Sequence, residues 1–300
     1  MTNTALPKIG FIGVGRMGGQ MALNTHKAGF AVTAFDVFPA ALAPLTSAGI
    51  ASAASRVEIA SVADIIILML PSDDALKETM EGDDNLLSVL REGQIVVDMS
   101  TSKLATSRYY AQRVSAQRAH MLDAPVSGGT GGAQNATLSI MVGGEKAIFD
   151  RCLPVFSAMG KTVTYIGDHG MGLVAKMVNQ MLMEATFCAV AESFAFAVKA
   201  GADVEIVYEA VRNGLAGSKV LDQTIQAFLS GELGTGRELT LHYKDGGYAL
   251  DAVASVNAWA PVTELTHKLF SDAMAAGQGD KSAPALAKIF EDRLGVKVIS

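Results

Sequence analysis

The chain has 300 residues, half of them hydrophobic, and a formal net charge of −6. This length and composition allow two domains with separate hydrophobic cores and argue against a disordered chain. Lysine and arginine form no cluster, so the sequence offers no electrostatic surface for nucleic acid or for an anionic membrane.

The cysteines, the histidines and the N-terminal residues give no sign of a secreted or metal-binding protein. Cys152 and Cys188 are the only cysteines, and they lack the spacing of a disulfide framework or of metal ligands. The five histidines also lie outside metal-ligand patterns, so we expect no metal. Residues 1–5 have neither the charge nor the apolar core of a signal peptide. These features predict a cytoplasmic protein.

From about residue 8 to residue 167, short β-rich apolar runs alternate with helix-like stretches. This alternation predicts strand–helix–strand units that form a buried, mainly parallel sheet. The run 65–70 contains no polar residue, as expected for a central strand covered on both faces, and we expect Pro71 to end it. The predicted strands are 9–12, 31–35, 65–70, 94–99, 121–124, 138–142 and 162–166.

A glycine-rich turn follows the first of these runs directly. Gly13 permits a sharp turn, Gly15 lets the backbone approach a pyrophosphate, and Gly18 allows a helix to pack closely on the strand. Asp36 ends the second run, about 20 residues further on, where a ribose-binding carboxylate is expected. We therefore predict an α/β fold with a Rossmann-type, doubly wound dinucleotide-binding domain over residues 1–167. Its predicted phosphate-binding turn consists of Gly13, Val14, Gly15, Arg16, Met17 and Gly18.

The residues around Asp36 favour NAD over NADP. A carboxylate there accepts hydrogen bonds from the adenosine ribose and repels a 2′-phosphate, and the next two residues, Val37 and Phe38, supply no arginine to bind one. The ends of later strands supply four more candidate cofactor contacts, although each of them also fits a simple strand terminus. These candidates are Leu70, Pro71, Ser100 and Thr101.

After Gly167 the β-rich runs stop, and helical periodicity continues to the end of the sequence. This change predicts an all-helical second domain over residues 168–300. Its first helix, about 171–199, is apolar on nearly all sides, so we expect it inside the helical domain or in the interface of a homodimer or homotetramer. Polar residues such as Lys176 and Glu184 make it too polar, in our interpretation, to span a membrane.

The segment 121–129 ends a predicted strand with a proline and then supplies a hydroxyl group and two glycines. Ser127, Gly128 and Gly129 could together bind a carboxylate through the hydroxyl and accessible N–H groups. The same residues equally fit a tight connection between two elements.

A second glycine-rich turn, 167–172, precedes the helix that carries Lys176. Asn179 and Gln180 follow at i+3 and i+4, on the same helix face as the lysine. Lys176 either extends its ammonium group from an apolar helix to water or is a partly desolvated group beside two amides. The neighbouring amides, and the position just after the last strand, favour the second interpretation.

With these motifs, the sequence resembles the β-hydroxyacid dehydrogenase family, which includes 3-hydroxyisobutyrate dehydrogenase and tartronate semialdehyde reductase. Four motifs occur in the family's order: residues 11–18, 123–129, 170–180 and 244–251. Within the family, Asn179-Gln180 and the segment 214–218 are most similar to tartronate semialdehyde reductases. Lys244-Asp245 is followed by Gly246-Gly247, where relatives usually carry a leucine first.

The resemblance implies roles for these residues. Lys176 would act as the general acid in carbonyl reduction and as the base in alcohol oxidation, with a pKa lowered by the apolar helix. Ser127, Gly128 and Gly129 would hold the carboxylate of a small acid, and Asn179 and Gln180 would orient its reacting group. Lys244 would lie near the cofactor. The implied reaction interconverts a small 3-hydroxy acid and its 3-oxo acid, with tartronate semialdehyde as the first candidate.

Two alternatives stay open. The substrate could be 3-hydroxyisobutyrate or a β-hydroxy amino acid such as serine. The chain could also be a non-catalytic dinucleotide-binding sensor, since a fold alone does not establish activity. The lysine, the amide pair and the serine-glycine loop argue against a sensor. Imine reductases share the architecture but usually lack the lysine.

Overall fold

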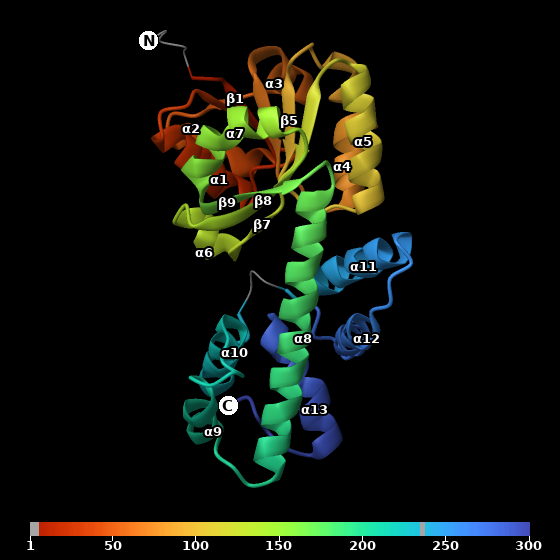
Figure 1. Cartoon of the computed structure of the whole chain (residues 1–300). Helices are drawn as coiled ribbons and strands as arrows, with labels where there is room; N and C mark the ends of the chain where they lie inside the picture. Colours follow the sequence, from red (N-terminus) through yellow and green to blue (C-terminus); the bar gives the residue numbers. More distant parts are fainter. Residues whose placement is uncertain (1–5, 235–237) are drawn as a thin grey trace. The chain divides into compact units, whose positions relative to one another are not determined.

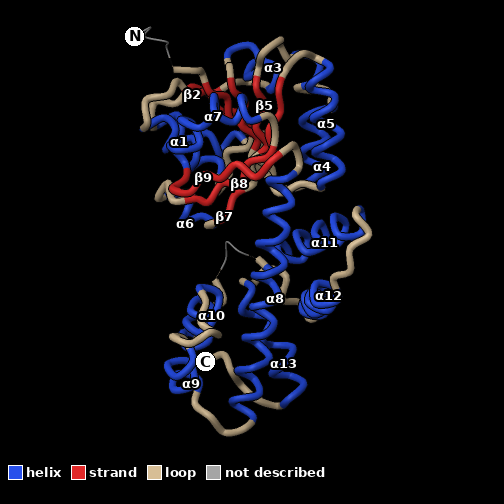
Figure 2. The backbone as a smooth tube through the Cα atoms, viewed as in Figure 1, coloured by secondary structure: helices blue, strands red, loops and turns tan. Residues whose placement is uncertain are grey.

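The computed structural model describes residues 6–234 and 238–300 and divides the chain into two compact units, residues 1–176 and 177–300. Figure 1 labels the elements along the chain, and Figure 2 distinguishes helices, strands and loops. Residues 1–5, which bear on the signal-peptide expectation, lie outside the described part of the chain.

Unit 1 is built on a nine-stranded sheet with the order β3-β2-β1-β4-β5-β6-β8-β7, and β9 pairs with β8. All pairs from β3 to β6 are parallel, β8 is antiparallel to β6 and β7, and β9 is parallel to β8. The prediction of a mainly parallel, Rossmann-type sheet is confirmed, and its first six strands follow the order known for that fold. The strands are β1 (Ile9–Ile12), β2 (Val32–Phe35), β3 (Ala51–Ser52), β4 (Ile65–Leu68), β5 (Ile95–Asp98), β6 (His120–Asp123), β7 (Val126–Ser127), β8 (Leu138–Gly143) and β9 (Gly160–Gly167).

Three details of the sheet differ from the sequence prediction. β3 and β7 were not predicted, because two residues are too few to show the alternation of polar and apolar side chains that is typical of a strand. β4 ends at Leu68, so Pro71 does not end the strand. The N–H of Met69 still donates to Ile12 O at 3.0 Å, but the N–H of Leu70 turns to the hydroxyl of Ser100 at 2.8 Å.

Helices cover both faces of this sheet (Figure 1). α1, α2 and α7 pack on one face, and α3, α4 and α5 pack on the other, each with its own buried apolar cluster. The fully buried run Ile65–Leu68 in the centre reflects this two-sided cover. The helices of unit 1 are α1 (Gly18–Lys27), η1 (Pro39–Leu42), α2 (Ala43–Ser47), α3 (Arg56–Val62), α4 (Asp73–Glu81), η2 (Leu87–Val89), α5 (Leu104–Ala116), α6 (Gly129–Gln134) and α7 (Lys146–Met159).

Unit 2 is helical, with no strand among residues 177–234 and 238–300. Its core contains Phe187, Phe194, Phe228 and Phe270, which come from three of its helices. The long helix α8 (Met171–Lys199) coincides with the predicted helix and continues from unit 1 into unit 2. The remaining helices are α9 (Val204–Val211), α10 (Lys219–Ser230), α11 (Leu239–Ser255), α12 (Pro261–Ala275), η3 (Ala283–Leu286) and α13 (Ala287–Leu294).

By length and composition alone, α8 could cross a membrane, and it is the one such helix in the described part of the chain. In contrast to the sequence interpretation, its polar residues do not by themselves exclude a span. The buried residues Phe187, Ala191 and Phe194 belong to the core of unit 2, and a core helix meets the same two criteria. The helix is not covered on all sides, because Leu182 and Phe196 are exposed.

Candidate active site

The glycine-rich turn has the geometry that a dinucleotide requires. Gly13 has a φ of +87°, and a Cβ on Gly13 or Gly18 would lie closer than 3.0 Å to a backbone oxygen, that of Met69 or of Gly13. A Cβ on Gly15 would meet nothing within 4 Å, so the backbone is open to an approaching group. The turn leads into the N-terminus of α1, where N–H groups and the helix dipole favour a phosphate. These residues fit a bound dinucleotide.

Asp36 connects the end of β2 to this turn. Its Oδ2 accepts the N–H of Val14 at 2.8 Å, and its Oδ1 accepts the N–H of Phe38 at 2.9 Å. Each carboxylate oxygen can accept further hydrogen bonds, so a ribose hydroxyl could still bind there. Arg16 is exposed, and Met17 is half-buried just before α1.

The later strand ends are joined by hydrogen bonds to a buried carboxylate, Asp98. The N–H of Ser100 donates to Asp98 Oδ1 at 3.0 Å, and the hydroxyl of Ser102 donates to Asp98 Oδ2 at 3.1 Å. Burial raises the pKa of Asp98 to about 6, against the opposing effect of these hydrogen bonds. Ser100 is itself buried and holds the loop at Leu70, whereas Pro71 is exposed and Thr101 is half-buried.

The structure brings Lys176 to the serine-glycine loop within unit 1. Lys176 is only 8% exposed, and its Nζ donates to Val126 O at 3.0 Å, directly before Ser127. Gly128 has a φ of +133° and is exposed, and Gly129 begins α6. The ammonium group therefore does not extend to water, and the interpretation as a desolvated lysine is the one that the geometry favours.

The two amides of α8 belong to a hydrogen-bonded chain in unit 2. Nδ2 of Asn179 donates to Oε1 of Gln180 at 2.9 Å, and Nε2 of Gln180 donates to Oδ2 of Asp245 at 2.7 Å. Nζ of Lys244 lies 3.2 Å from the other oxygen of Asp245. The side chains of Lys244 and Asp245 are 23% and 12% exposed, so this charged pair is largely shielded from solvent.

Gly246 is buried, and polar side chains surround it. A Cβ there would lie 2.7 Å from Oε2 of Glu184 and 3.1 Å from Nδ1 of His267. Nδ1 of His242 lies 3.8 Å from the other oxygen of Glu184. The glycine thus leaves room for polar side chains from α8, α11 and α12.

Asp98 and Asp123 were not candidates in the sequence, and the structure shows both to be buried hydrogen-bond acceptors. They are register partners on the neighbouring strands β5 and β6. Each is the last residue of its strand, where a carboxylate follows buried apolar residues, and this position is the signal that could have identified them. Asp245 was part of a quoted motif but was not a candidate either.

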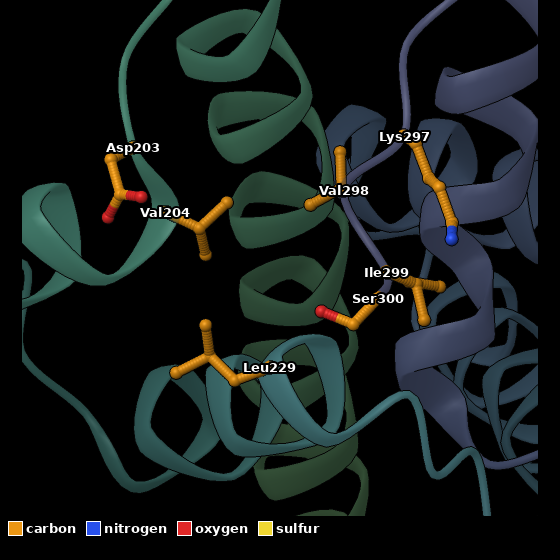
Figure 3. A pocket seen from close by; sticks show the side chains of 7 residues that line it. All are labelled: Asp203, Val204, Leu229, Lys297, Val298, Ile299 and Ser300. Carbon is orange, nitrogen blue, oxygen red and sulfur yellow. The ribbon is translucent and has the colours of Figure 1, made fainter.

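Three further features of the described residues bear on other kinds of site. Within residues 6–234 and 238–300, no group of three or more histidine, cysteine or acidic side chains could hold a metal ion. Burial raises the pKa of Cys152 and of Cys188 to about 12, which leaves both thiols protonated. A hollow of about 210 Å³ in unit 2 contains none of the predicted site residues. Figure 3 shows the side chains that line it. It is lined by Asp203, Val204, Leu229, Lys297, Val298, Ile299 and Ser300.

Comparisons with known proteins show which family the chain is similar to. Residues 8–167 match the NAD binding domain of 6-phosphogluconate dehydrogenase, and residues 170–290 match the family described as NAD-binding of NADP-dependent 3-hydroxyisobutyrate dehydrogenase. The chain is 34% identical to 2-(hydroxymethyl)glutarate dehydrogenase of Eubacterium barkeri over 97% of both chains. It is also 34% identical to 2-hydroxy-3-oxopropionate reductase of Escherichia coli, over 95% of this chain and 97% of that one.

A solved structure of similar fold is Mycobacterium tuberculosis 3-hydroxyisobutyrate dehydrogenase with L-serine. The identity is 28%, the TM-score is 0.86, and the match covers 95% of this chain and 99% of that one.

Proposed function

We propose a substrate for this chain, which belongs to the β-hydroxyacid dehydrogenase family and is an NAD(P)-dependent dehydrogenase acting on a CH–OH group. The proposed reaction interconverts a small 3-hydroxy acid and its 3-oxo acid. Our first candidate is the reduction of tartronate semialdehyde to glycerate, with NAD as the cofactor. The observation that carries the proposal is the buried ammonium group of Lys176 on Val126 O, beside the serine-glycine loop.

Lys176 is the proposed catalytic residue. Its ammonium group protonates the carbonyl oxygen during reduction, and its amine accepts the hydroxyl proton in the reverse direction. The hydroxyl of Ser127 and the N–H groups of Gly128 and Gly129 bind the substrate carboxylate through charge-assisted hydrogen bonds. When bound, the dinucleotide supplies or accepts the hydride.

The proposed cofactor site lies in the domain 1–167. The turn from Gly13 to Gly18, with Val14, Arg16 and Met17, holds the phosphates, and the open space at Gly15 supports this assignment. Asp36 binds the ribose and disfavours a 2′-phosphate. Four strand-end residues and one lysine of the helical domain, 168–300, complete the proposed set: Leu70, Pro71, Ser100, Thr101 and Lys244.

The amide pair Asn179 and Gln180 supports tartronate semialdehyde over methylmalonate semialdehyde. A hydroxyl group on the substrate can exchange hydrogen bonds with an amide, whereas a methyl group there would leave the amide without that partner. The similarity to 2-hydroxy-3-oxopropionate reductase supports the same choice. Because the similar solved structure is a dehydrogenase with L-serine, serine is the main alternative to test.

We also propose a cytoplasmic location and a homodimer or homotetramer. The exposed apolar side chains of Val178, Leu182 and Phe196 on one helix support self-association, because such exposed apolar surface is typical of interfaces.

The decisive experiment measures initial rates with a panel of acids. NADH and NADPH oxidation is followed with tartronate semialdehyde, methylmalonate semialdehyde and succinate semialdehyde. NAD reduction is followed with glycerate, 3-hydroxyisobutyrate, 2-(hydroxymethyl)glutarate and L-serine.

We expect the highest kcat/KM with NADH and tartronate semialdehyde. A higher kcat/KM with any other acid would replace the proposed substrate. Equal rates with NADPH would remove the role of Asp36 in cofactor choice. NADH binding without turnover on any acid would instead support a non-catalytic sensor.

A further inference from the structure

The buried carboxylate of Asp123 binds the backbone on either side of the start of α8. Its Oδ1 accepts the N–H of Gly170 at 2.7 Å, and its Oδ2 accepts the N–H of Leu173 at 2.8 Å. Asp123 is 0% exposed. The first N–H groups of a helix have no partner within the helix, and a carboxylate is the acceptor that the helix dipole favours there.

Glycines allow this close approach between helix and sheet. A Cβ on Gly143 would lie 2.5 Å from Asp123 Oδ1 and 2.7 Å from the backbone nitrogen of Gly172. A Cβ on Gly172 would lie closer than 3.0 Å to the backbone oxygens of Met141 and Asp123. The first turn of α8 therefore lies directly against the ends of β6 and β8, with no space for a side chain between them.

The ring of His169 also lies beside this carboxylate. Its Nδ1 lies 3.6 Å from Asp123 Oδ1 and 3.3 Å from Met121 O, and its Nε2 lies 2.9 Å from the hydroxyl of Ser107. With the proton on Nδ1, the ring donates to Met121 O and accepts from Ser107. Ser107 is completely buried, so this serine, histidine and aspartate do not form a nucleophilic site.

The position of Lys176 follows from that of the first turn of α8, because Lys176 lies only three residues after Leu173 on the same helix. Its Nζ reaches Val126 O, three residues after Asp123 in the sequence. The segment 123–126 is thus joined to α8 twice, through the carboxylate at one end and through the ammonium group at the other. A shift of the first turn would move Nζ relative to Ser127.

We propose that Asp123 is a positioning residue, which sets the place of Lys176 relative to the serine-glycine loop by holding the first turn of α8. The inference rests on the proposed function of Lys176. Asp123 does not touch the substrate, because its side chain is enclosed and both oxygens are hydrogen-bonded to backbone. Its register partner Asp98 binds Ser100 and Ser102 instead, so the two neighbouring carboxylates serve different segments.

The test uses Asp123→Asn, Lys176→Ala and the double variant, with NADH and tartronate semialdehyde as substrates and L-serine with NAD as the second assay. Asn can accept only one of the two N–H groups, so the first turn of α8 loosens. We expect kcat of Asp123→Asn to fall about 10²-fold, because misplacement of about 1 Å can have that effect. KM for NADH should stay within about twofold of the wild-type value, since the residues proposed to bind the dinucleotide are unchanged. Amide hydrogen exchange in the peptide covering 168–175 should become faster.

The matched control is Glu291→Gln in unit 2. Glu291 is also buried, and its Oε1 accepts two backbone N–H groups, those of Val298 and Ile299, at 2.6 and 2.8 Å. This variant should lose stability, leave kcat unchanged and leave hydrogen exchange at 168–175 unchanged.

The double variant separates the possible failures. If Asp123 acts through Lys176, the double variant has the same kcat as Lys176→Ala. A normal kcat in Asp123→Asn with faster exchange at 168–175, or multiplicative losses in the double variant, would overturn the inference. A near-normal kcat in Lys176→Ala would overturn the proposed function, and this inference with it.

A milder variant keeps the test valid if Asp123→Asn does not fold. Ser107→Ala removes only the hydroxyl that contacts His169, and it should lower kcat about fivefold, as expected for one hydrogen bond. An unchanged kcat in Ser107→Ala would then count against the inference.

Discussion

The two units place polar groups in different ways. In unit 1 the candidate binding groups are largely backbone, at the turn around Gly15, where a Cβ would meet nothing within 4 Å, and at the exposed Gly128. In unit 2 they are side chains, and Asn179, Gln180 and Asp245 form a hydrogen-bonded chain between two helices. A backbone site depends on the geometry of one short turn, whereas a side-chain site depends on how distant segments pack.

This difference predicts how each unit fails. A substitution in the glycine-rich turn of unit 1 should act by filling space or by moving the backbone, so its effect should depend on that single residue. A substitution in unit 2 should act through the loss of a partner, so its effect should spread to the neighbouring side chain.

The largest effect is expected at Lys176, a side-chain group that lies beside the backbone groups of unit 1. Lys176→Ala should lower kcat by about 10² to 10⁴, the range for loss of a general acid or base, with the Kd for NADH within about twofold. Steady-state rates and a fluorescence titration with NADH measure both quantities.

Lys199→Ala is the matched control, because Lys199 lies on the same helix and its Nζ also donates to a backbone carbonyl, that of Leu294, at 2.8 Å. We expect normal kcat in this variant. A comparable loss of kcat in both variants would mean that Lys176 contributes to the fold and not to the chemistry.

The next contrast lies within the glycine-rich turn. Gly18→Ala should destabilise unit 1 by about 1–3 kcal/mol, because its Cβ has no space beside Gly13 O. Gly15→Ala should leave the unfolding free energy within about 1 kcal/mol and weaken NADH binding at least about tenfold, because the methyl group occupies the open space.

Urea unfolding and NADH titration separate the two effects. Gly234→Ala, at another glycine with nothing within 4 Å of its Cβ position, should change neither quantity. Unchanged NADH affinity in Gly15→Ala would show that phosphates do not approach at this glycine.

Much of the fold could be predicted because its signals are local. The apolar strands, the glycine turn and the start and end of α8 each lie within a few neighbouring residues, and α8 occurs where periodicity placed it. The short strand β7 was missed for the opposite reason. Its two residues pair with β8, and nothing in Val126-Ser127 itself signals that partner.

The candidate site was predictable only in part, for the same reason. The role of Lys176 could be proposed from its motif, but its bond to Val126 O spans 50 residues. The bond from Gln180 to Asp245 spans 65 residues, and the acceptor role of Asp123 depends on glycines in two other segments. Local sequence patterns do not show which distant residues will pair, because such pairings arise from the packing of the folded chain.

A smaller effect on activity is expected when the hydrogen-bonded side chains of unit 2 lose one member. Gln180→Leu removes its hydrogen bonds to Asn179 and Asp245, one of them charge-assisted, and should lower the unfolding free energy by about 3 kcal/mol. It should also lower kcat/KM, because Asn179 loses the partner that orients it.

Gln94→Leu is the matched control in unit 1, where a buried glutamine donates to Ala60 O and Ala63 O at 2.8 Å. It should lose similar stability and keep its kcat/KM. If Gln180→Leu also keeps its kcat/KM, the chain in unit 2 is structural only.

The smallest effect is the pH dependence of the unfolding free energy. A buried carboxylate in unit 1 and one in unit 2 contribute to it with opposite signs. Burial raises the pKa of Asp98 from 3.8 to about 6. The contribution of Asp98 to stability is therefore fully present below pH 3.8 and is lost as the pH rises through about 6. Between about pH 4 and pH 7 the unfolding free energy of the wild type should fall by about 2 kcal/mol relative to Asp98→Asn, which cannot titrate.

Glu291 in unit 2 behaves in the reverse way. Burial raises its pKa, but the N–H of Ile299, Lys288 and the N–H of Val298 together hold it below the ordinary value of 4.5. Its contribution is present above pH 4.5 and is lost as the pH falls through the lowered pKa. In urea unfolding at a series of pH values, the wild type should therefore gain stability relative to Glu291→Gln as the pH rises and lose it relative to Asp98→Asn. If the plots of unfolding free energy against pH for the two variants run parallel to that of the wild type, each buried carboxylate keeps the same charge in the folded and the unfolded chain.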